Sequence, residues 1–268
     1  MSFSIAGKTA IVTGAANGVG LAIGRHFVEQ GAQVVFADMD EDHLTKELGD
    51  KIGDDTAPYR VFAGDLREKL TIANLLSATI DAFDRVDILV NASRQVALSN
   101  PLCSDDDAVD VMLRQNLMTS LRLSQAIAKR MIKQSEGEER NSCGSIINLS
   151  SIAARRAHPE LLGYSISTAA LDQMTRSLAV ALAPHRIRVN AVAFGSVMSA
   201  SLKDALRGHD EIRSEILDHT PLHRIAGPGE VSDAVQYLAS DASNFVTGEI
   251  ITVDGGRTLI DPVAAPAH

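Results

Sequence analysis

The chain has 268 residues, 45% of them hydrophobic and 22% charged, which is ordinary for a soluble globular protein with a large core. A net charge of −9 argues against a nucleic-acid surface, which needs a basic stripe. The sequence has no apolar run near the ~20 residues of a membrane span and no basic-then-apolar signal peptide. Cys103 and Cys143 have neither metal nor redox spacing, so we expect a cytoplasmic protein with no metal site.

Residues 9 to 38 contain a short series of elements around a glycine-rich turn. Thr9–Thr13 is a β-branched apolar run, as in a buried strand, and the turn Gly14–Gly20 follows at once. A helical pattern then runs to Gly31, and a second apolar run over 34–37 ends at Asp38. Strand, glycine turn, helix, strand and acid in this order predict a dinucleotide-binding unit. A tight turn without a ligand is the alternative.

Each residue type in this unit has a physical reason. Gly14 lets the chain turn sharply, and Gly18 and Gly20 let the backbone approach a pyrophosphate. Free N–H groups and the dipole at the helix start favour the phosphates. Asp38, 18 residues after Gly20, can accept hydrogen bonds from ribose hydroxyls and repels a 2′-phosphate. Because residues 39–42 and the glycine turn supply no Arg or Lys, we expect NAD rather than NADP.

The following residues continue the alternation of helices and strands. The pattern predicts a helix over 40–49, a strand over 59–63, a helix over 67–83 and a strand over 86–91. It favours an α/β fold with a doubly wound parallel sheet, which binds ligands at the carboxyl ends of its strands. Asp65, at one such end, could accept from an adenine amino group or cap the next helix. Asn91, at another, could serve the ribose, hold neighbouring strands together or shape a turn.

The second half of the chain repeats this pattern without a linker, so we expect a single domain over residues 1–268. The predicted elements are a helix over 105–134, a strand over 145–149, a helix over 164–183, a strand over 187–193, an amphipathic helix near 202–217, a helix over 228–239 and a strand over 247–253. Asn116 falls on an apolar face of the first of these helices, where a buried Asn needs a hydrogen-bond partner.

A hydroxyl and a phenol are predicted to meet above the sheet. Ser151 lies at the carboxyl end of a strand, and Tyr164 opens the next helix 13 residues later. Together they could polarise a carbonyl and exchange its proton. A buried Tyr with a satisfied hydroxyl and a Ser that caps a helix are the alternatives.

From Lys8 to about Gly256 the chain resembles the short-chain dehydrogenase/reductase family. The matching motifs, in the family's order, are residues 13–20, Asp38, Asp65-Leu66, Asn91-Ala92, Asn116, Ser150-Ser151, Tyr164–Ser167, Arg188–Val192, Thr247-Gly248 and Val253–Gly256. The resemblance implies a Rossmann-type sheet of seven strands and a bound nicotinamide dinucleotide. It also implies a homotetramer, with the helices near 105–134 and 164–183 at one interface.

The resemblance also implies roles for individual residues. Tyr164 matches the general acid/base, Ser151 the residue that holds the substrate oxygen, and Asn116 the residue that positions a water in the proton relay. The positions that match the cofactor site are Gly14, Asn17, Gly18, Val19, Gly20, Asp38, Asp65, Leu66, Asn91, Ala92, Tyr164, Gly195, Val197 and Ser199.

One departure from the family concerns the charge beside the phenol. The family pattern is Tyr-x-x-x-Lys, but the fourth residue after Tyr164 is Thr168, which lies one helical turn on, is shorter and carries no charge. To poise a phenol near neutral pH takes about 4 kcal/mol of preferential phenolate stabilisation. Without the lysine, slower turnover, an alkaline-shifted optimum for alcohol oxidation, or no activity is expected.

Smaller departures cluster nearby. The family's Asn-Ala-Gly is Asn91-Ala92-Ser93 here, followed by Arg94. Phe194-Gly195 replaces the usual Pro-Gly, and Ser199 replaces a threonine but keeps the hydroxyl. A guanidinium of Arg94, Arg155 or Arg156 could supply the missing charge, or all three could be solvated surface arginines.

Two interpretations of function remain open. The first interpretation is an NAD(H)-dependent oxidoreductase that interconverts a secondary alcohol and a ketone at a modified active site. The second is a catalytically weak or inactive NAD(H)-binding protein with a sensing or scaffolding role. The substrate-loop region of about 194–220, with residues 93–98 and 152–162, suits a medium-sized hydroxy or keto compound.

Overall fold

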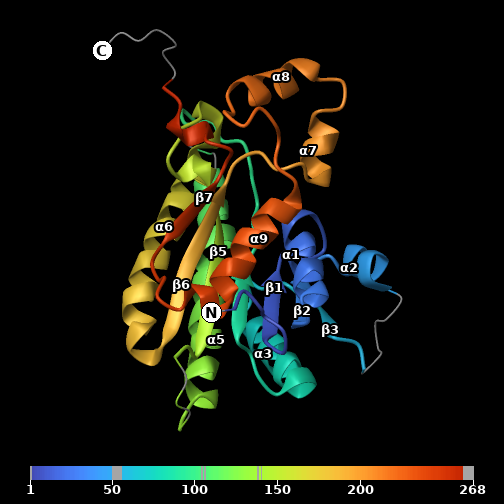
Figure 1. Cartoon of the computed structure of the whole chain (residues 1–268). Helices are drawn as coiled ribbons and strands as arrows, with labels where there is room; N and C mark the ends of the chain where they lie inside the picture. The colour runs from blue at the N-terminus through green and yellow to red at the C-terminus, as the bar shows by residue number, and fades with distance from the viewer. Residues whose placement is uncertain are drawn as a thin grey trace.

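A parallel sheet forms the centre of the molecule (Figure 1). The computed structural model describes residues 2–49, 56–103, 105, 107–137, 139 and 141–261, apart from the side chains of residues 200 and 201. Seven strands occur in that part of the chain: β1 (Thr9–Thr13), β2 (Gln33–Asp38), β3 (Tyr59–Ala63), β4 (Ile88–Asn91), β5 (Gly144–Ser151), β6 (Ile187–Phe194) and β7 (Ile250–Val253). β1, β4, β5 and β6 are buried along their whole length, as expected of strands covered on both faces.

The strands lie in the order β3-β2-β1-β4-β5-β6-β7, and every pair is parallel. From β1 the chain adds β2 and β3 on one side, and then crosses back to add β4 on the other. The order therefore reverses between β1 and β4, the position where open parallel sheets bind ligands. The predicted Rossmann-type, doubly wound sheet of seven strands in a single domain is confirmed.

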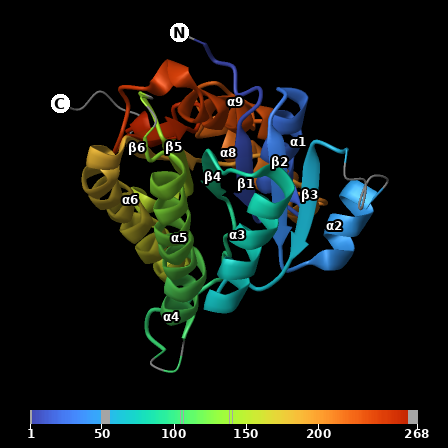
Figure 2. The same cartoon turned by 90° about the horizontal axis from the view of Figure 1, so that it is seen from below.

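Helices cover both faces of the sheet. Figure 2 shows α1 (Gly18–Glu29) and α9 (Pro228–Ala239) on one face, and α3 (Lys69–Phe83), α5 (Thr119–Gln134) and α6 (Leu162–Leu182) on the other. The short helix α2 (Glu41–Leu48) packs beside β3 at the edge. A separate apolar cluster lies beneath each helical layer.

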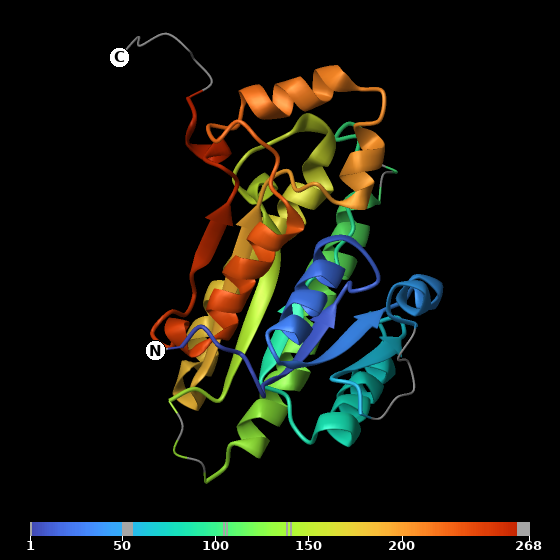
Figure 3. The ribbon, with the colours of Figure 1, turned by 45° about the vertical axis from the view of Figure 1, so that its right-hand side comes forward.

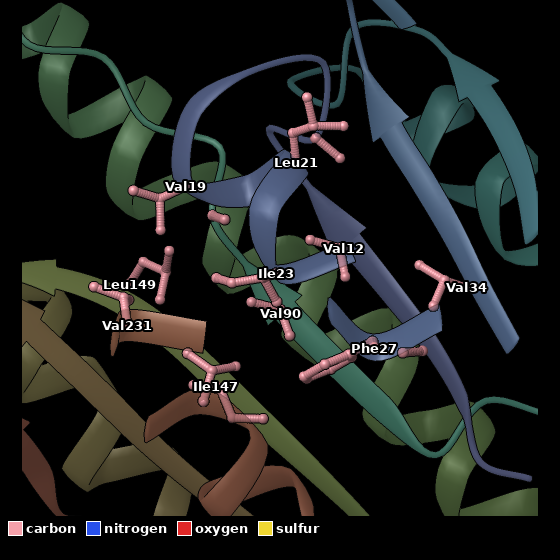
Figure 4. Close-up of a cluster of buried hydrophobic side chains, with 14 of the residues drawn as sticks. Val12, Val19, Leu21, Ile23, Phe27, Val34, Val90, Ile147, Leu149 and Val231 are labelled. Carbon is pink, nitrogen blue, oxygen red and sulfur yellow. The ribbon is translucent and has the colours of Figure 1, made fainter. Parts of the chain in front are cut away.

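The cluster beneath α1 holds the first helix against the sheet (Figure 4). Val12 of β1, Val90 of β4 and Ile147 of β5 pack in one cluster with Ile23 and Phe27 of α1. All five side chains are fully buried. Burial of each is worth roughly 1.5–3 kcal/mol. This packing fixes the start of α1 next to the carboxyl end of β1.

Two short helices, α7 (Ala200–Ala205) and α8 (Asp210–Asp218), stand at the end of the molecule to which the strand arrows point (Figure 3). The sequence predicted one helix near 202–217, and this is wrong. Gly208 adopts a φ of 81° between the two helices, a left-handed conformation that a continuing helix cannot contain.

The helix predicted over 105–134 is not continuous. It begins later, as α4 (Ala108–Met112), passes through a π-helical segment (Leu113–Met118) and continues as α5. The π-helical segment contains Asn116, whose side chain bonds to the loop after β4. Such local widening of a helix often occurs at functional sites.

Other predicted boundaries move by a few residues. α6 begins at Leu162, two residues before Tyr164. β7 begins at Ile250 rather than at residue 247, because Gly248 turns the chain with a φ of 79°. The predicted helix over 228–239 is confirmed with both bounds.

No helix within the described residues is long and apolar enough to cross a membrane. The same residues contain no group of three or more His, Cys, Asp or Glu that could hold a metal ion. Cys103 is exposed and Cys143 is buried, and both are free thiols.

Candidate active site

A cleft of about 1070 Å³ opens at the carboxyl ends of the strands, where the sheet order reverses. Pockets for drug-sized ligands measure roughly 300–1,000 Å³, so this cleft can accept an extended dinucleotide. The predicted cofactor residues that line it are Gly14, Asn17, Gly18, Val19, Gly20, Asp38, Asp65, Leu66, Ala92, Gly195, Val197 and Ser199. Asn91 and Tyr164 are not in its lining.

The turn after β1 approaches its neighbours too closely for side chains. A Cβ on Gly20 would lie 2.1 Å from the Gly14 carbonyl oxygen, and one on Gly14 would lie 2.7 Å from that of Ala92. A Cβ on Gly18 would meet only the Ser199 Cβ, at 4.0 Å. Gly14 and Gly20 therefore shape the turn, and Gly18 keeps space open toward the cleft.

The start of α1 is suited to an anion. Asn17 is the N-cap residue but makes no side-chain capping bond, and the first turn contains no acidic residue. The N–H groups of this turn therefore lack a side-chain cap, and the helix dipole adds positive potential. Together with the open face of Gly18, this arrangement fits the pyrophosphate of a dinucleotide.

Asp38 ties the end of β2 to the glycine turn. Its Oδ2 accepts a hydrogen bond of 3.0 Å from the Ala16 N–H, and its Oδ1 accepts one of 3.1 Å from the Asp40 N–H. An ionised carboxylate has about four lone-pair sites, so Asp38 keeps capacity for ribose hydroxyls.

Asp65 is paired with Arg67, a residue that the sequence did not single out. Asp65 Oδ2 accepts from Arg67 Nη2 at 2.6 Å, and Oδ1 accepts from the Arg67 N–H at 3.0 Å. The Arg67 guanidinium holds the pKa of Asp65 below its ordinary value. Arg67 lines the same cleft, and Asp65 compensates its charge there.

Asn91 holds neighbouring elements together, one of the three roles that its sequence position allowed. Its Nδ2 donates to Asn148 Oδ1 of β5 at 2.8 Å and to Ser124 Oγ of α5 at 3.1 Å. Next to it, the Ala92 N–H donates to Thr13 Oγ1 at 3.1 Å, which joins the ends of β4 and β1.

The two serines at the end of β5 differ in what they contact. Ser150 Oγ donates to Asp172 Oδ1 at 2.6 Å, inside the fold, where burial raises the pKa of the Asp172 carboxyl. Ser151 Oγ accepts from the Ala153 N–H at 3.1 Å. In the sheet Ser151 is directly opposite Phe194 of β6. Ser151 is therefore the hydroxyl that remains free to donate.

Tyr164 is held in the first turn of α6 by close backbone packing. A Cβ on the preceding Gly163 would lie 2.9 Å from the Ala108 carbonyl oxygen, so the two helices touch at this glycine. The Tyr164 side chain is buried, with 5% of the residue exposed. Sequence reasoning missed Gly163, although a glycine directly before the tyrosine was a visible signal.

Thr168 is buried one turn after Tyr164 and directs its hydroxyl into its own helix. Its Oγ1 lies 2.9 Å from the Tyr164 carbonyl oxygen and 3.2 Å from that of Ser165, and it can donate to either. Such bonds from a mid-helix Thr to the preceding turn are common. Thr168 thus brings no cation to the site.

Asn116 is buried, and the partner that it needs is the loop after β4. Its Oδ1 accepts from the Gln95 N–H at 2.8 Å, and its Nδ2 donates to the Gln95 carbonyl at 3.0 Å and to Ser167 Oγ at 3.1 Å. The Asn116 carbonyl accepts from Ser120 Oγ at 2.9 Å. Asn116 thereby joins the π-helical segment, the loop and α6.

Arg94 is the one of the three candidate arginines that contacts the phenol. Its Nη1 donates to Tyr164 Oη at 2.9 Å, and its guanidinium carbon lies 4.2 Å from the centre of the Phe194 ring. Arg155 instead donates to Thr252 Oγ1, and Arg156 donates to the Thr258 carbonyl. Two departures from the family pattern, Arg94 and Phe194, are therefore in contact with each other.

The segment after β6 forms the remaining wall of the cleft. The Gly195 N–H donates to the Val253 carbonyl at 3.2 Å, and Val197 forms an isolated bridge with Ala226. Ser199 caps α7, its Oγ accepting from the Leu202 N–H at 3.3 Å.

The strand order, the glycine turn and the acid after β2 define a Rossmann-class protein with a cleft at the carboxyl ends of its strands. The family model described as enoyl-(acyl carrier protein) reductase matches residues 14–258. An uncharacterized oxidoreductase of Mycobacterium tuberculosis is 32% identical to the chain, covering 96% of it and 94% of the relative. The chain belongs to the short-chain dehydrogenase/reductase family of oxidoreductases.

Two solved structures share the fold along nearly the whole chain. A gluconate 5-dehydrogenase from Burkholderia cenocepacia, in complex with NADP and tartrate, has a TM-score of 0.85 at 27% identity, covering 97% of this chain and 98% of that one. A 7α-hydroxysteroid dehydrogenase, in complex with NADH and 7-oxo glycochenodeoxycholic acid, has a TM-score of 0.84 at 29% identity, covering 95% of each chain. Relatives of this chain therefore bind either nicotinamide cofactor.

Proposed function

We propose that this protein is an NAD(H)-dependent oxidoreductase that interconverts a secondary alcohol and a ketone. The observation that carries the proposal is the Tyr164 phenol, held by Arg94 beside a cleft whose walls fit a dinucleotide. Ser151 lies at the end of β5, opposite Phe194, on which the Arg94 guanidinium stacks. The phenol is thus bonded to a charged side chain that lines the cleft, and we propose that the Ser151 hydroxyl serves the same substrate oxygen.

In this proposal the protein handles the substrate oxygen and its proton. A bound nicotinamide supplies or accepts the hydride at the substrate carbon. In the reductive direction, Ser151 donates a hydrogen bond to the carbonyl oxygen, and Tyr164 transfers its phenolic proton to that oxygen. In the oxidative direction Tyr164 takes the proton from the alcohol. Asn116 positions the loop that carries Arg94.

The cleft favours NAD over NADP. Asp38 places a carboxylate at the end of β2, where a 2′-phosphate would be repelled. Arg67 is the basic residue at this end of the cleft, and its bond to Asp65 compensates its charge. Both observations support NAD, although relatives with NADH and with NADP are known.

The substrate is proposed to be a medium-sized hydroxy or keto compound. The segment 152–162 and the substrate-loop region of about 194–220 stand at the same end of the molecule as the end of β5 and the start of α6, the elements that carry Ser151 and Tyr164 (Figure 1). They combine apolar side chains with Arg155 and Arg156, which suits an anionic group on the substrate.

Calorimetry with NADH, NAD⁺ and NADPH, followed by NADH oxidation with a panel of ketones and NAD⁺ reduction with secondary alcohols at pH 7 to 10, tests the proposal. We expect NADH to bind more tightly than NADPH, and at least one ketone to be reduced. Tyr164→Phe is expected to lower the rate by about 10²–10⁴-fold with an unchanged Kd for NADH. Equal rates in the parent and in Tyr164→Phe would contradict the assigned role.

The second candidate is an NAD(H)-binding protein with little or no catalytic activity. The observation that favours it is Thr168, whose hydroxyl serves its own helix. The same experiment separates the two candidates, since this second protein binds NADH but transfers no hydride to any ketone at any pH. A homotetramer is proposed for both, and light scattering measures it.

A further inference from the structure

The positive charge that Thr168 lacks is present on Arg94, in the loop after β4. Thr168 is 2% exposed and uncharged, and its hydroxyl is committed to backbone carbonyls. Arg94, in the loop after β4, donates from Nη1 to Tyr164 Oη at 2.9 Å. A guanidinium keeps its positive charge throughout the working pH range of enzymes. The contact therefore places a permanent cation on the phenol oxygen.

The side chain of Arg94 is fixed by a second contact. Its guanidinium lies over the Phe194 ring at 4.2 Å, within the range of a cation–π interaction. The family's proline at position 194 has no aromatic face, so Phe194 provides a platform specific to this chain. The stacked ring and the phenol together direct the guanidinium at Tyr164 Oη.

The backbone on either side of Arg94 is also held. The Asn116 carboxamide bonds to both the N–H and the carbonyl of Gln95, and Gln115 Nε2 donates to Ser93 Oγ at 3.1 Å. Arg94 thus lies between two anchored residues. A preorganised charge of this kind needs no rearrangement when charge develops on its partner.

We infer that Arg94 is the positioning residue that takes over the function of the missing lysine and stabilises the phenolate of Tyr164. The inference rests on the proposed oxidoreductase function. In reduction, the O–H bond of Tyr164 breaks as its proton passes to the substrate oxygen, and the hydride of the bound dinucleotide reaches the carbon. The ketone becomes an alcohol, the dinucleotide is oxidised, and a phenolate remains beside the guanidinium. In oxidation the same steps run in reverse.

The other charged groups near this part of α6 are bonded elsewhere or exposed. Asp172 bonds to Ser150, and Arg155 bonds to Thr252. Arg188 of β6 bonds to Leu238, Ser240 and Ser243. The remaining charged or titratable groups on elements packed against α6 are exposed, namely Asp110, Arg114, His158, Glu160 and His185, and Arg176 of α6 itself is exposed as well. Arg94 is thus the charged group, among the described residues, that contacts the Tyr164 phenol.

The test replaces the charge while keeping the length of the side chain. Arg94→Met retains an unbranched apolar chain that can lie on Phe194. Arg130→Met is the matched control, because Arg130 also donates from its guanidinium to a backbone carbonyl, that of Asp84 at 2.9 Å, and lies near the carboxyl end of α5, outside the site. We expect Arg94→Met to move the pH profile of alcohol oxidation by about one unit toward alkaline pH and to lower the rate at pH 7 about tenfold. A profile equal to that of Arg130→Met would overturn the inference.

A second variant distinguishes charge from structure. Thr168→Lys in the Arg94→Met background returns a cation from α6, and we expect it to move the pH profile back toward neutral pH. A purely structural role of Arg94 predicts no recovery. A faster reaction in Arg94→Met than in the parent would mean that the guanidinium obstructs the phenol, and would also overturn the inference.

Tyrosinate absorbance provides a readout that needs no substrate. The chain has three tyrosines and no tryptophan, so the absorbance that Tyr164→Phe removes belongs to Tyr164. We expect this absorbance to appear at higher pH in Arg94→Met than in the parent, with ADP-ribose present to cover the cleft. Unchanged titration of Tyr164 overturns the inference. If the parent reduces no ketone and this shift is seen, the proposed function fails while Arg94 keeps its role.

Discussion

Asn116 in the π-helical segment binds both backbone groups of Gln95 through its side chain, with hydrogen bonds of 2.8 and 3.0 Å. Because Gln95 follows Arg94, this pair of bonds connects the helical layer to the loop beside the phenol. The family resemblance predicts that Asn116 positions a water, and that role stays a prediction. The carboxamide of Asn116 has a second function here, as the anchor of the loop.

Asn116→Ala is expected to lower both stability and activity. It removes the bonds to Gln95 and the bond to Ser167 from a site that is 2% exposed, which costs about 2 kcal/mol of unfolding free energy. It also frees the loop of Arg94, so the rate of hydride transfer falls more than the loss of folded protein explains. Urea denaturation and steady-state kinetics below the melting temperature measure the two effects.

Asn190→Ala is a matched control for this prediction. Asn190 of β6 is also fully buried, and its carboxamide likewise bonds a backbone carbonyl, of Val246, and a backbone N–H, of Glu249. A similar loss of stability with an unchanged pH profile is expected. If both variants have the same kinetics, Asn116 does no more than stabilise the fold.

The carboxylate of Asp38 is expected to set the choice of dinucleotide. Asp38→Asn keeps an oxygen for the Ala16 N–H but removes the negative charge, so the affinity for NADPH is expected to rise about tenfold, equal to roughly 1.4 kcal/mol. The affinity for NADH is expected to fall, since a neutral amide accepts more weakly from the ribose. Calorimetry with both dinucleotides measures the ratio. Asp40→Asn, a variant of the exposed N-cap of α2, should leave it unchanged.

Alanine substitutions at Gly18 and Gly20, the two glycines at the start of α1, are expected to have different effects. Gly20→Ala forces a Cβ to within 2.1 Å of the Gly14 carbonyl oxygen, so the turn must move and both stability and NADH binding are lost. Gly18→Ala has room but a φ of 57°, which costs roughly 1–2 kcal/mol, and its methyl group narrows the cleft. Thermal melts with and without NADH measure both effects.

Gly229→Ala provides the control for the glycine variants. Gly229 lies in the first turn of α9 with nothing within 4 Å of its Cβ position, and Ala favours a helix by up to about 1 kcal/mol. We expect an equal or higher melting temperature and unchanged NADH binding. Loss of NADH binding in Gly229→Ala would show that the effects of Gly18→Ala and Gly20→Ala on NADH binding are not specific to the glycine turn.

Glu230 is expected to contribute stability that disappears in acid. Hydrogen bonds from Arg224 lower the pKa of Glu230 to about 2, and the Gly227 N–H adds to the effect. A carboxyl whose pKa is lower in the folded state stabilises the fold above its unfolded pKa, and the contribution is lost as pH falls through about 2. The pair is 54% and 39% exposed, so solvent screening limits its contribution to about 1 kcal/mol.

Glu230→Gln measures this contribution directly. We expect it to lower the unfolding free energy at pH 7 by about 1 kcal/mol, and the difference from the parent to shrink between about pH 4 and pH 2. Denaturant titrations at several pH values follow the difference. A difference that is constant across this range would mean that the charge of Glu230 is not responsible.

The sequence determined the architecture, because the residue patterns that predict strands, helices and turns extend over only a few consecutive residues. Alternation of apolar runs with helical patterns predicted the parallel sheet, and Gly14–Gly20 with Asp38 predicted the crevice at the carboxyl ends of β1 and β2. Backbone conformation and strand burial depend on a few consecutive residues, which a pattern can reveal. The local breaks at Gly208 and in the π-helical segment were missed, because an apolar periodicity continues across them.

The tertiary structure decided which side chains meet. The sequence offered Arg94, Arg155 and Arg156 equally as sources of the missing charge, and only the fold brings Arg94 to Tyr164, which lies 70 residues further along the chain. It likewise decided that Asn91 joins strands and that Asp65 pairs with Arg67. The reason is that hydrogen bonds and charge pairs act over a few ångströms in space, and spacing along the chain does not fix those distances.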